Sequence, residues 1–402
     1  MKKRFVAGLM SVVLVMGLLA GCGNQKGNAK TTKKSVGKKA VCTVQMNKNF
    51  NESLIKFLED NGYKDKNYMV SPTSFRAALA LAVEGAAGVT REELLKAMGF
   101  ESMEEIPVWY DSVQKSVDRF YEYADDYSVE NMDYRIQNSI WNNSSQGGDF
   151  SKKYIKEMTE KYNATAENAT SNEITDKVNN WVKEGTNGLI PVIADNLSIY
   201  RAVLVNTLYL RTAWENNFWI YGNENFNTYD GKKVKKDYMQ QEEEMRYYED
   251  ENGKLVVVPM EGNIDAVFIL GDVKNVAEKI SKASYCHVTL RVPQFEAETS
   301  FESKELINYL QSLGVETAFN MDADFSNMYD EAEVYIEDIV QKTKIKADEN
   351  GIEAAAATAI MCDAAAAEMS EEKEFIADQP FRYMLTTDDE NAEVLFYGQV
   401  VE

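Results

Sequence analysis

The sequence has few of the residues from which enzyme sites are usually built. Its 402 residues include one histidine, His287, and four cysteines at positions 22, 42, 286 and 362, none of them in a C-x-x-C pair. A His-rich zinc site, a zinc ribbon, a redox cysteine pair and any mechanism that needs two imidazoles are therefore excluded. No G-x-S-x-G segment, P-loop or metal-ligand spacing occurs either. We therefore expect a protein that is not an enzyme and that uses no metal or cofactor.

Positive charge is also scarce, and it is unevenly distributed. The chain has 43 Lys and Arg against 65 Asp and Glu, which gives a formal net charge of -22. A chain this acidic repels phosphate backbones, so we expect no nucleic-acid partner. Residues 1–21 carry a charge of +3 and residues 22–41 carry +6, which leaves -31 for residues 42–402. The charge therefore separates a basic leading segment from an acidic body.

The basic leading segment predicts a signal peptide and a linker. Lys2, Lys3 and Arg4 precede an apolar stretch, residues 5–18, that is short for a membrane span. The following Leu19-Ala20-Gly21-Cys22 resembles the lipobox of bacterial lipoproteins, which implies cleavage after residue 21 and a lipid on Cys22. The alternative is an ordinary cleavage site with a coincidental cysteine. Residues 22–41 are rich in Gly, Asn, Thr and Lys and contain no acid, which is typical of a flexible linker.

The lipobox resemblance implies a secreted protein that is held by lipid on the outer face of a bacterial cell membrane. A basic linker would lie beside an anionic membrane, and the acidic body would be repelled from it. The six lysines of the linker could equally be solvated and have no specific partner. Both interpretations stay open.

Residues 42–402 predict one large α+β domain, because only six prolines occur in the whole chain and no Pro/Gly/Ser-rich break interrupts the body. Ser71-Pro72 favours the start of a helix that is apolar on nearly all sides up to Gly85 and should be buried. Thr90, with Glu93 at the capping-box spacing, predicts the cap of the next helix. The continuous apolar run Ala202–Leu210 predicts a central strand that is buried on both faces.

Further elements follow the same rules. We expect a helix over residues 174–184 and strands over residues 254–259, 266–270, 334–346 and 394–398. Helices dominate the first half of the body and strands the second, which indicates the α+β class.

Eight stretches of the body are similar, in order and spacing, to segments of the serpin family. They are Asn67–Ser74, Gly85–Thr90, Asn179–Val182 with Thr186–Gly188, Val205–Leu210 with Trp214 and Phe218, Val292–Phe295, Ala323–Ser326, Asp378–Phe381 and Leu395–Gly398. The resemblance covers roughly residues 49–401. It implies a monomer with about eight to nine helices, three β-sheets and an exposed reactive-centre loop near the C-terminus.

The stretch from Glu349 to Ala359 looks like the hinge of that loop. Composition alone would favour a solvent-exposed helix for the alanine run, and an uncut loop can be locally helical. The resemblance implies instead that these residues enter a sheet as a new strand, which small side chains permit and for which Gly351 supplies the pivot. The implied hinge residues are Glu349, Gly351, Ile352, Ala354, Ala355, Ala356, Ala357 and Thr358.

The implied function is suicide inhibition of serine or cysteine proteases. The protease would form an acyl-enzyme with the loop, and insertion of the cut loop into the main sheet would trap it. Family spacing implies the reactive bond Ala365–Ala366, within the stretch from Cys362 to Glu368, with Ala364, Ala366 and Ala367 as alternative cleaved residues. No Lys or Arg lies between Gly351 and Glu372, so an elastase-like or subtilisin-like target is expected and a trypsin-like target is not.

The sequence departs from the family pattern at two positions. Ile352 lies where inhibitory members usually have Thr or Ser, and it should face inward on insertion. Gln341 replaces the histidine of the family's shutter region, where we expect it to hydrogen-bond to Ser71 or Asn206. The other implied shutter and breach residues are Ser74 and Trp214. Because Ile352 could slow insertion, a non-inhibitory binding or surface protein of the same fold is the alternative function.

Overall fold

The computed structural model describes residues 49–301, 304–329, 334–353, 371–389 and 392–402, which lie within one unit of residues 40–402. Cys22, the linker, Ala354–Thr358 and the bond Ala365–Ala366 lie outside the described residues. Among the described helices, none is long and apolar enough to cross a membrane. Within the same ranges, no three His, Cys, Asp or Glu side chains come together in an arrangement that could hold a metal ion.

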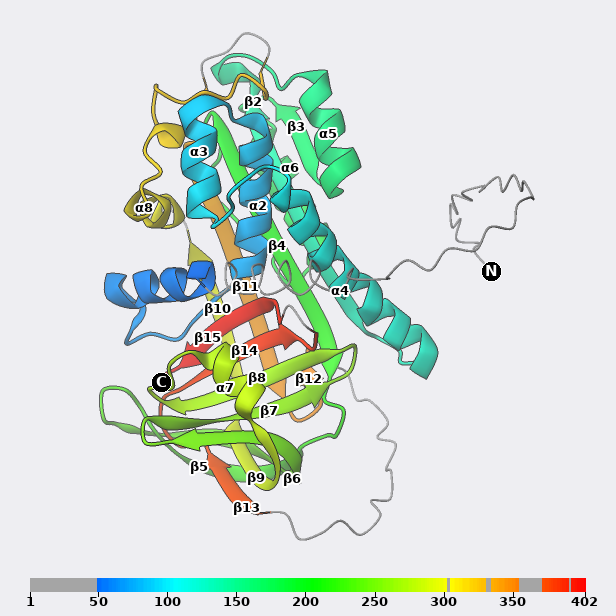
Figure 1. The fold of residues 1–402 in the computed structure, drawn as a ribbon, viewed down its shortest axis with the longest axis vertical. Coiled ribbons are helices and arrows are strands. Elements are labelled where there is room, and N and C mark those ends of the chain that lie inside the picture. The colour runs from blue at the N-terminus through cyan, green and yellow to red at the C-terminus, as the bar shows by residue number, and fades with distance from the viewer. Residues whose placement is uncertain (1–48, 302–303, 330–333, 354–370, 390–391) are drawn as a thin grey trace, which may run out of the picture. The chain divides into compact units, whose positions relative to one another are not determined.

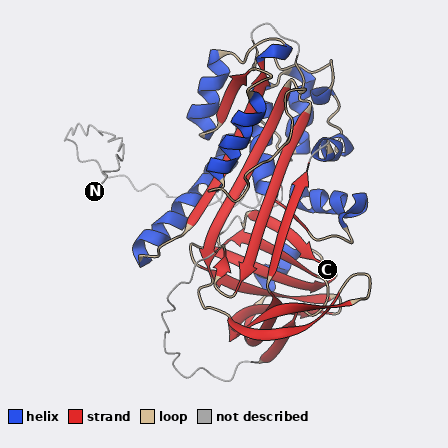
Figure 2. Ribbon diagram, turned by 180° about the vertical axis from the view of Figure 1, so that it is seen from behind, coloured by secondary structure: helices blue, strands red, loops and turns tan. Residues whose placement is uncertain are grey.

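The strand that the apolar run predicted is the centre of a six-stranded sheet with the order β10-β11-β12-β4-β2-β3 (Figures 1 and 2). The strands are β2 (Asp133–Asn143), β3 (Thr165–Ala169), β4 (Ala202–Ala213), β10 (Phe295–Phe301), β11 (Asp338–Asp348) and β12 (Gly351–Ile352). Strand β4 is buried along almost its whole length. This confirms the prediction of a strand covered on both faces.

A nine-stranded sheet has the order β1-β15-β14-β8-β7-β6-β9-β13, with β5 paired to one part of β6. Its strands are β1 (Tyr68–Val70), β5 (Trp219–Asn227), β6 (Lys233–Asp250), β7 (Gly253–Met260), β8 (Ile264–Gly271), β9 (Ser284–Pro293), β13 (Glu372–Ile376), β14 (Phe381–Thr387) and β15 (Val394–Val400). The long strand β6 pairs with β5 and β9 along much of its length and with β7 at its C-terminal end. It therefore joins two smaller sheets into one.

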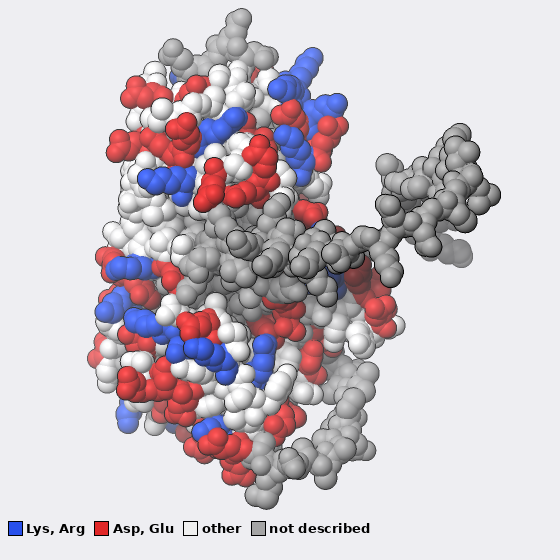
Figure 3. All heavy atoms as spheres, viewed as in Figure 1, with Lys and Arg blue, Asp and Glu red and all other residues white. Residues whose placement is uncertain are grey.

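Most of the described helices lie at the upper end of the view in Figure 1, whereas α7 and most strands of the nine-stranded sheet lie at the lower end. The helices are residues 49–58, continued by η1 (Glu59–Tyr63), α2 (Pro72–Gly85), α3 (Gly88–Ala97), α4 (Glu105–Tyr127), α5 (Lys152–Tyr162), α6 (Ile174–Gly185), α7 (Val276–Lys282) and α8 (Glu305–Ser312), with short turns η2 (Ser144–Gln146) and η3 (Thr317–Phe319). In the view of Figure 3, acidic and basic side chains are interspersed over this face. The mixture of helices and strands confirms the α+β class.

Helix α2 follows its sequence prediction closely. The Ser71 hydroxyl oxygen accepts a hydrogen bond from the Ser74 amide at 3.3 Å, and Pro72 is the first helical residue. Nearly every residue of the helix is buried, as its apolar composition on all sides predicted.

The predicted cap of α3 is wrong. The helix begins at Gly88, two residues before Thr90, and its N-cap residue Ala87 makes no side-chain cap. The Thr90 hydroxyl instead contacts the Thr317 hydroxyl at 2.8 Å, and Glu93 accepts the Thr317 amide at 2.9 Å. Both side chains that the capping-box spacing had assigned to the helix end therefore form hydrogen bonds with Thr317 in the turn η3 instead.

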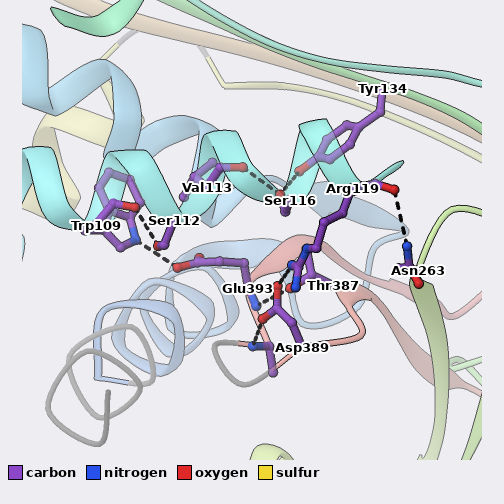
Figure 4. Close-up of polar contacts among 11 residues, drawn as sticks. Trp109, Ser112, Val113, Ser116, Arg119, Tyr134, Asn263, Thr387, Asp389 and Glu393 are labelled. Carbon is purple, nitrogen blue, oxygen red and sulfur yellow. Dashed lines mark hydrogen bonds and ion pairs between the residues drawn. The ribbon is translucent and has the colours of Figure 1, made fainter. Parts of the chain in front are cut away.

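A buried polar cluster fastens helix α4 to the end of the chain (Figure 4). The indole N–H of Trp109 donates to Glu393 Oε1 at 2.8 Å, and the Thr73 hydroxyl donates to Glu393 Oε2 at 2.9 Å. Further along the same helix, toward its C-terminus, Arg119 forms an ion pair with Asp389. Burial raises the pKa of Glu393, while the nearby Arg76 opposes that shift. The cluster holds α2, α4 and the β14–β15 connection together around the main core.

Candidate functional site

Strands β4 and β11 pair directly at only one end. Their parallel pairs run from Asp338 opposite Val203 to Gln341 opposite Asn206. At the other end the two residues of β12 lie between them. Ile352 pairs with Thr212 of β4 and with Ala347 of β11, and the neighbouring Gly351 pairs one residue further along on each side.

A slit separates these two ends. Residues 207–211 of β4 and 342–346 of β11 pair neither with each other nor with β12 among the described residues. The same residues remain paired on their outer sides, with β2 and β10 respectively. Five residues of extended chain span roughly 16 Å. The two strands are therefore unpaired with each other over five residues between β12, which lies between them, and the closed end, where they pair directly.

Ile352 anchors the chain at the open end of this slit. Its side chain is 2% exposed and belongs to the apolar cluster that also contains Leu208, Leu210 and Ile345. It faces inward, as the sequence predicted for an inserted residue. A buried, β-branched apolar side chain stabilises this position by burial and by strand preference.

Gly351 is required by its surroundings. Its φ is +147°, and an added Cβ would lie 2.3 Å from the Thr212 carbonyl oxygen and 2.6 Å from Ala213 Cα. Neither backbone atom can move without opening the sheet. The position therefore accepts only glycine. Its role as the pivot of the loop stays a prediction.

The residues before the pivot are fixed by the segment that follows β4. The Trp214 indole N–H donates to the Asp348 carbonyl at 2.8 Å, and the Trp214 amide donates to the Asn350 carbonyl at 3.2 Å. The Phe218 amide donates to the Glu349 carbonyl at 3.1 Å, and the Glu349 carboxylate accepts from the Gln294 side chain at 2.7 Å. Residues 348–350 thus cannot slide along the sheet without breaking these contacts.

Glu353 is the last described residue before the alanine run, and it faces the outer side of the sheet. Its φ of +52° is unusual for a residue with a side chain, and its amide donates to the Lys346 carbonyl at 3.0 Å. It lines a cavity of about 440 Å³ together with Tyr209, Arg211 and Lys346. Burial raises the pKa of Glu353, and a hydrogen bond from Tyr209 and the charge of Arg211 oppose that shift.

A hydrogen-bonded cluster closes the other end of the slit. The Gln341 side-chain amide donates to the Asn206 Oδ1 atom at 2.7 Å and to the Ser71 carbonyl at 3.0 Å, and its own oxygen accepts the Ser71 amide at 3.0 Å. The Ser74 hydroxyl also donates to Asn206 Oδ1, at 2.9 Å. The predicted hydrogen bonds of Gln341 are therefore confirmed. The Asn206 Nδ2 atom and the Thr207 hydroxyl are buried and have no hydrogen-bond partner among the described residues.

The comparisons with known proteins agree with this geometry. The sequence model of the family described as "Serpin (serine protease inhibitor)" matches residues 45–402. The chain belongs to the serpin family. The serpin fold that the sequence implied is thereby confirmed.

Several relatives are similar over most of their length. A leukocyte elastase inhibitor from Bos taurus is 26% identical over 83% of this chain and 92% of its own. An uncharacterized serpin-like protein from Thermococcus kodakarensis is 29% identical over 88% of this chain and 84% of its own. Among solved structures, a highly specific serpin of the insect Tenebrio molitor has 26% identity and a TM-score of 0.74, and covers 92% of this chain and 99% of that chain.

The native state of the thermophilic serpin tengpin is also similar. It has 26% identity and a TM-score of 0.72, and the match covers 94% of this chain and 97% of that chain.

The structure places the predicted serpin site residues in two groups. Ser71, Ser74, Asn206 and Gln341 meet at the closed end of the slit, whereas Trp214 lies at the open end with Glu349, Gly351 and Ile352. The remaining hinge residues and the predicted reactive bond lie outside the described residues.

Two residues of the site were missed from the sequence. Glu353 is the only charged residue between Gly351 and Asp363, which is a signal that could have singled it out. Thr207 lies on the open edge of β4, and nothing in its local sequence distinguishes it. The lone histidine, His287, is a half-buried strand residue of β9.

Proposed function

We propose that this serpin inhibits serine proteases of elastase-like or subtilisin-like specificity by offering residues 354–370 as a substrate loop. After cleavage, the N-terminal part of the loop inserts into the slit and traps the acyl-enzyme. The observation that carries the proposal is the pairing of Gly351 and Ile352 with both β4 and β11, directly before an open slit of five residues. This pairing supports insertion, because the first two residues of the proposed new strand already lie between β4 and β11.

The register of β12 supports the fit of the alanine run. Continued along β4, it sets Glu353 opposite Arg211 and Ala357 opposite Thr207, so residues 353–357 match the five open positions. Side chains alternate across a strand, so Ala354 and Ala356 would follow Ile352 to the inner face. Alanine adds little volume between packed strands, which keeps the cost of opening them low.

The same register gives Thr358 a specific partner. It sets Thr358 on the inner face, opposite Asn206 and Gln341 at the closed end. The buried Nδ2 atom of Asn206 has no hydrogen-bond partner among the described residues, and a threonine hydroxyl could accept its hydrogen. Beyond this point the loop must replace four direct pairs between β4 and β11. It would make two new ladders in exchange, so insertion proceeds without a net loss of sheet hydrogen bonds.

The residues of the predicted reactive bond support the choice of target. Ala365 lies fourteen residues after Gly351, and small apolar residues surround it. A small specificity pocket accepts alanine, whereas a pocket built for a basic side chain gains nothing from it. The similarity to a leukocyte elastase inhibitor points in the same direction.

Incubation with elastase and with subtilisin tests the proposal. We expect a complex with at least one of them that survives denaturing electrophoresis, and mass spectrometry should find a released fragment that starts at Ala366 or an adjacent alanine. Cleavage with full recovery of protease activity and no complex would overturn it.

The alternative is a non-inhibitory binding or surface protein, which the isoleucine at position 352 favours. The melting temperature after loop cleavage separates the two functions. Insertion of a strand should raise it strongly, because the new strand would add hydrogen-bonded ladders to both β4 and β11. An unchanged melting temperature would favour the alternative.

We also propose that the chain is a monomer that is anchored through a lipid on Cys22 to the outer face of a bacterial cell membrane. The lipobox resemblance and the acid-free, Lys-rich linker support this location. Expressed in a bacterial host, the protein should partition into the detergent phase, and a Cys22→Ser variant should stay in the aqueous phase. Equal partition of both proteins would contradict the anchor.

A further inference from the structure

Four strands of the nine-stranded sheet, β5, β6, β9 and β13, present an outer face that neither the slit nor the hinge uses. Its side chains alternate with core residues such as Val288, Leu290 and Phe375, which are buried. Hydrogen-bond register sets the outward side chains in three rows across the sheet. The rows are Glu244, His287 and Glu372; Glu242, Thr289 and Glu374; and Trp219, Gln240, Arg291 and Ile376.

Aromatic side chains lie at both ends of this outer face. Trp219 is 46% exposed and Tyr221 is 41% exposed, and the Arg291 guanidinium lies 3.5 Å from the centre of the Tyr221 ring. Tyr285, at the opposite end of β9, is 70% exposed. Exposed tryptophan, tyrosine and stacked arginine are the residues most enriched where proteins bind one another.

The centre of the outer face is acidic. Glu242, Glu244, Glu372 and Glu374 are all exposed. The polar contacts within the face do not neutralise this charge: Glu242 accepts from the Gln240 side chain at 2.8 Å, and Glu244 lies 3.9 Å from the His287 ring. Arg291 donates to Gln240 at 2.7 Å, and Lys373 pairs with Glu371 at 2.7 Å. Lys254 donates to the main-chain carbonyl of Glu374 rather than to its carboxylate. A partner that covers this face must therefore bring positive charge.

The position of the outer face identifies its occupant. Strand β13 directly follows residues 354–370, and Ala365 precedes Glu372 by seven residues, which span at most about 25 Å when fully extended. At the other edge, Trp219 follows Phe218, whose amide holds Glu349 at the start of the hinge. The face thus lies between the two points where the substrate loop leaves the sheets. A protease that binds Ala365 is held within this reach of β13, which brings its body next to the face.

We propose that the outer face of β5, β6, β9 and β13 is a second contact surface for the body of the protease that takes the loop, and that it selects proteases with a basic surface. The inference rests on the proposed inhibitory function and adds a determinant of target choice to it. The glutamates would speed the encounter by electrostatic attraction, and Trp219 and Tyr221 would supply the close contact. The protein would then discriminate among proteases that all accept alanine at the cleaved bond.

Association kinetics test the inference with two elastase-type proteases of matched specificity, one of basic and one of acidic pI. For the basic protease, a Glu242→Lys/Glu374→Lys variant should lower the second-order rate constant at least tenfold at low salt, with a smaller loss at high salt. A Trp219→Ala/Tyr221→Ala variant should lower it at both salt concentrations. The stoichiometry of inhibition should not change, because these residues lie outside the slit.

A matched control carries the same charge change elsewhere. Glu157→Lys/Glu160→Lys alters two carboxylates on α5, which lies at the opposite end of the view in Figure 1 from β9 and β13, and it should leave the rate constant unchanged. Equal melting temperatures would show that all variants fold. Equal rate constants for the outer-face variants and the wild type would overturn the inference.

A second measurement separates this inference from the inhibitory function. The basic protease with its catalytic serine replaced by alanine can bind the loop but cannot form an acyl-enzyme. If the wild type forms no covalent complex, the inhibitory function fails, yet binding to this inactive protease still reports on the outer face. Weaker binding of the outer-face variants would support the second contact surface, and unchanged binding would refute it.

Discussion

The two ends of the β4–β11 pair differ in what holds them. At the closed end, Gln341 ties both strands to the start of α2, and Val178 and Val182 of α6 share an apolar cluster with the outer side of β4. At the open end, Gly351 and Ile352 keep the same strands one strand's width apart, and a cavity lies on the outer side. Polar contacts with strict geometry close one end, whereas apolar burial of Ile352 holds the other. If the loop inserts as proposed, the sheet should open from Ile352 toward Gln341, because the polar contacts at the closed end are the last to be reached.

The largest effect should come from a charge at the hinge. Ile352→Arg would place a guanidinium where the side chain is 2% exposed, and an unpaired buried charge costs roughly 3 kcal/mol or more. We expect the stable complex with protease to fall by about 100-fold, with the loop cleaved as a simple substrate. Densitometry of denaturing gels measures this.

Ile352→Thr is the matched control for this variant. It keeps a β-branched side chain of moderate size, so it should still form the complex. If the arginine variant inhibits as well as the threonine variant does, the open end is not where insertion begins.

A smaller effect should follow from Gly351→Ala. The added Cβ lies 2.3 Å from a backbone oxygen, so β12 must leave its place between β4 and β11. Overpacking of this kind costs about 1–3 kcal/mol, and we expect inhibition to slow by roughly tenfold. Stopped-flow inhibition kinetics measure the rate.

Gly314→Ala isolates the contribution of backbone strain. Gly314 has a φ of +91°, and a Cβ added to it would have no atom within 4 Å. The substitution should lower stability by about 1 kcal/mol and leave the inhibition rate unchanged. Equal inhibition rates for Gly351→Ala and Gly314→Ala would show that the close backbone contact at Gly351 does not affect inhibition.

Loss of the polar tie at the closed end should have a moderate effect. Gln341→Leu leaves the buried Ser71 amide and the Asn206 carbonyl group without this partner, which should cost about 2 kcal/mol of unfolding free energy. Urea unfolding measures the loss. Gln341→His restores a hydrogen-bonding side chain and should recover part of the stability, with a new dependence on pH near about 6.5. A leucine variant as stable as the wild type would contradict the distinction between the two ends.

The smallest effect concerns pH at the open end. Burial raises the pKa of Glu353 above its usual value of 4.5, so the folded hinge binds this proton more tightly than the unfolded chain does. Its contribution is therefore most favourable below pH 4.5, and it declines as the pH rises from there through the raised pKa. Amide exchange of residues 349–353, corrected for the intrinsic rate, should show protection that falls across this range. Glu353→Gln should abolish the slope, and an unchanged slope would assign it to another group.

Local features of the structure were predictable because their causes are local. Ser71-Pro72 started a helix where expected, since a hydroxyl cap and a fixed φ act within one turn. The run from Ala202 to Leu210 identified β4, since a strand covered on both faces shows no polar alternation. The prediction for Thr90 failed because Thr317, 227 residues further along the chain, offered its hydroxyl a better partner.

The residues alone were sufficient to indicate the family, the need for glycine at position 351 and the small side chains of the hinge. The slit and the position of Ile352 within the sheet depended on the tertiary structure. Strands β4 and β11 are 135 residues apart where Asn206 meets Gln341, and their pairing depends on packing against α2 on one face and α6 on the other. The outer face of β5, β6, β9 and β13 likewise joins residues from four separate segments. The local sequence does not reveal which distant strands pair, because the register between two strands is set by how both faces of the sheet pack against the rest of the protein.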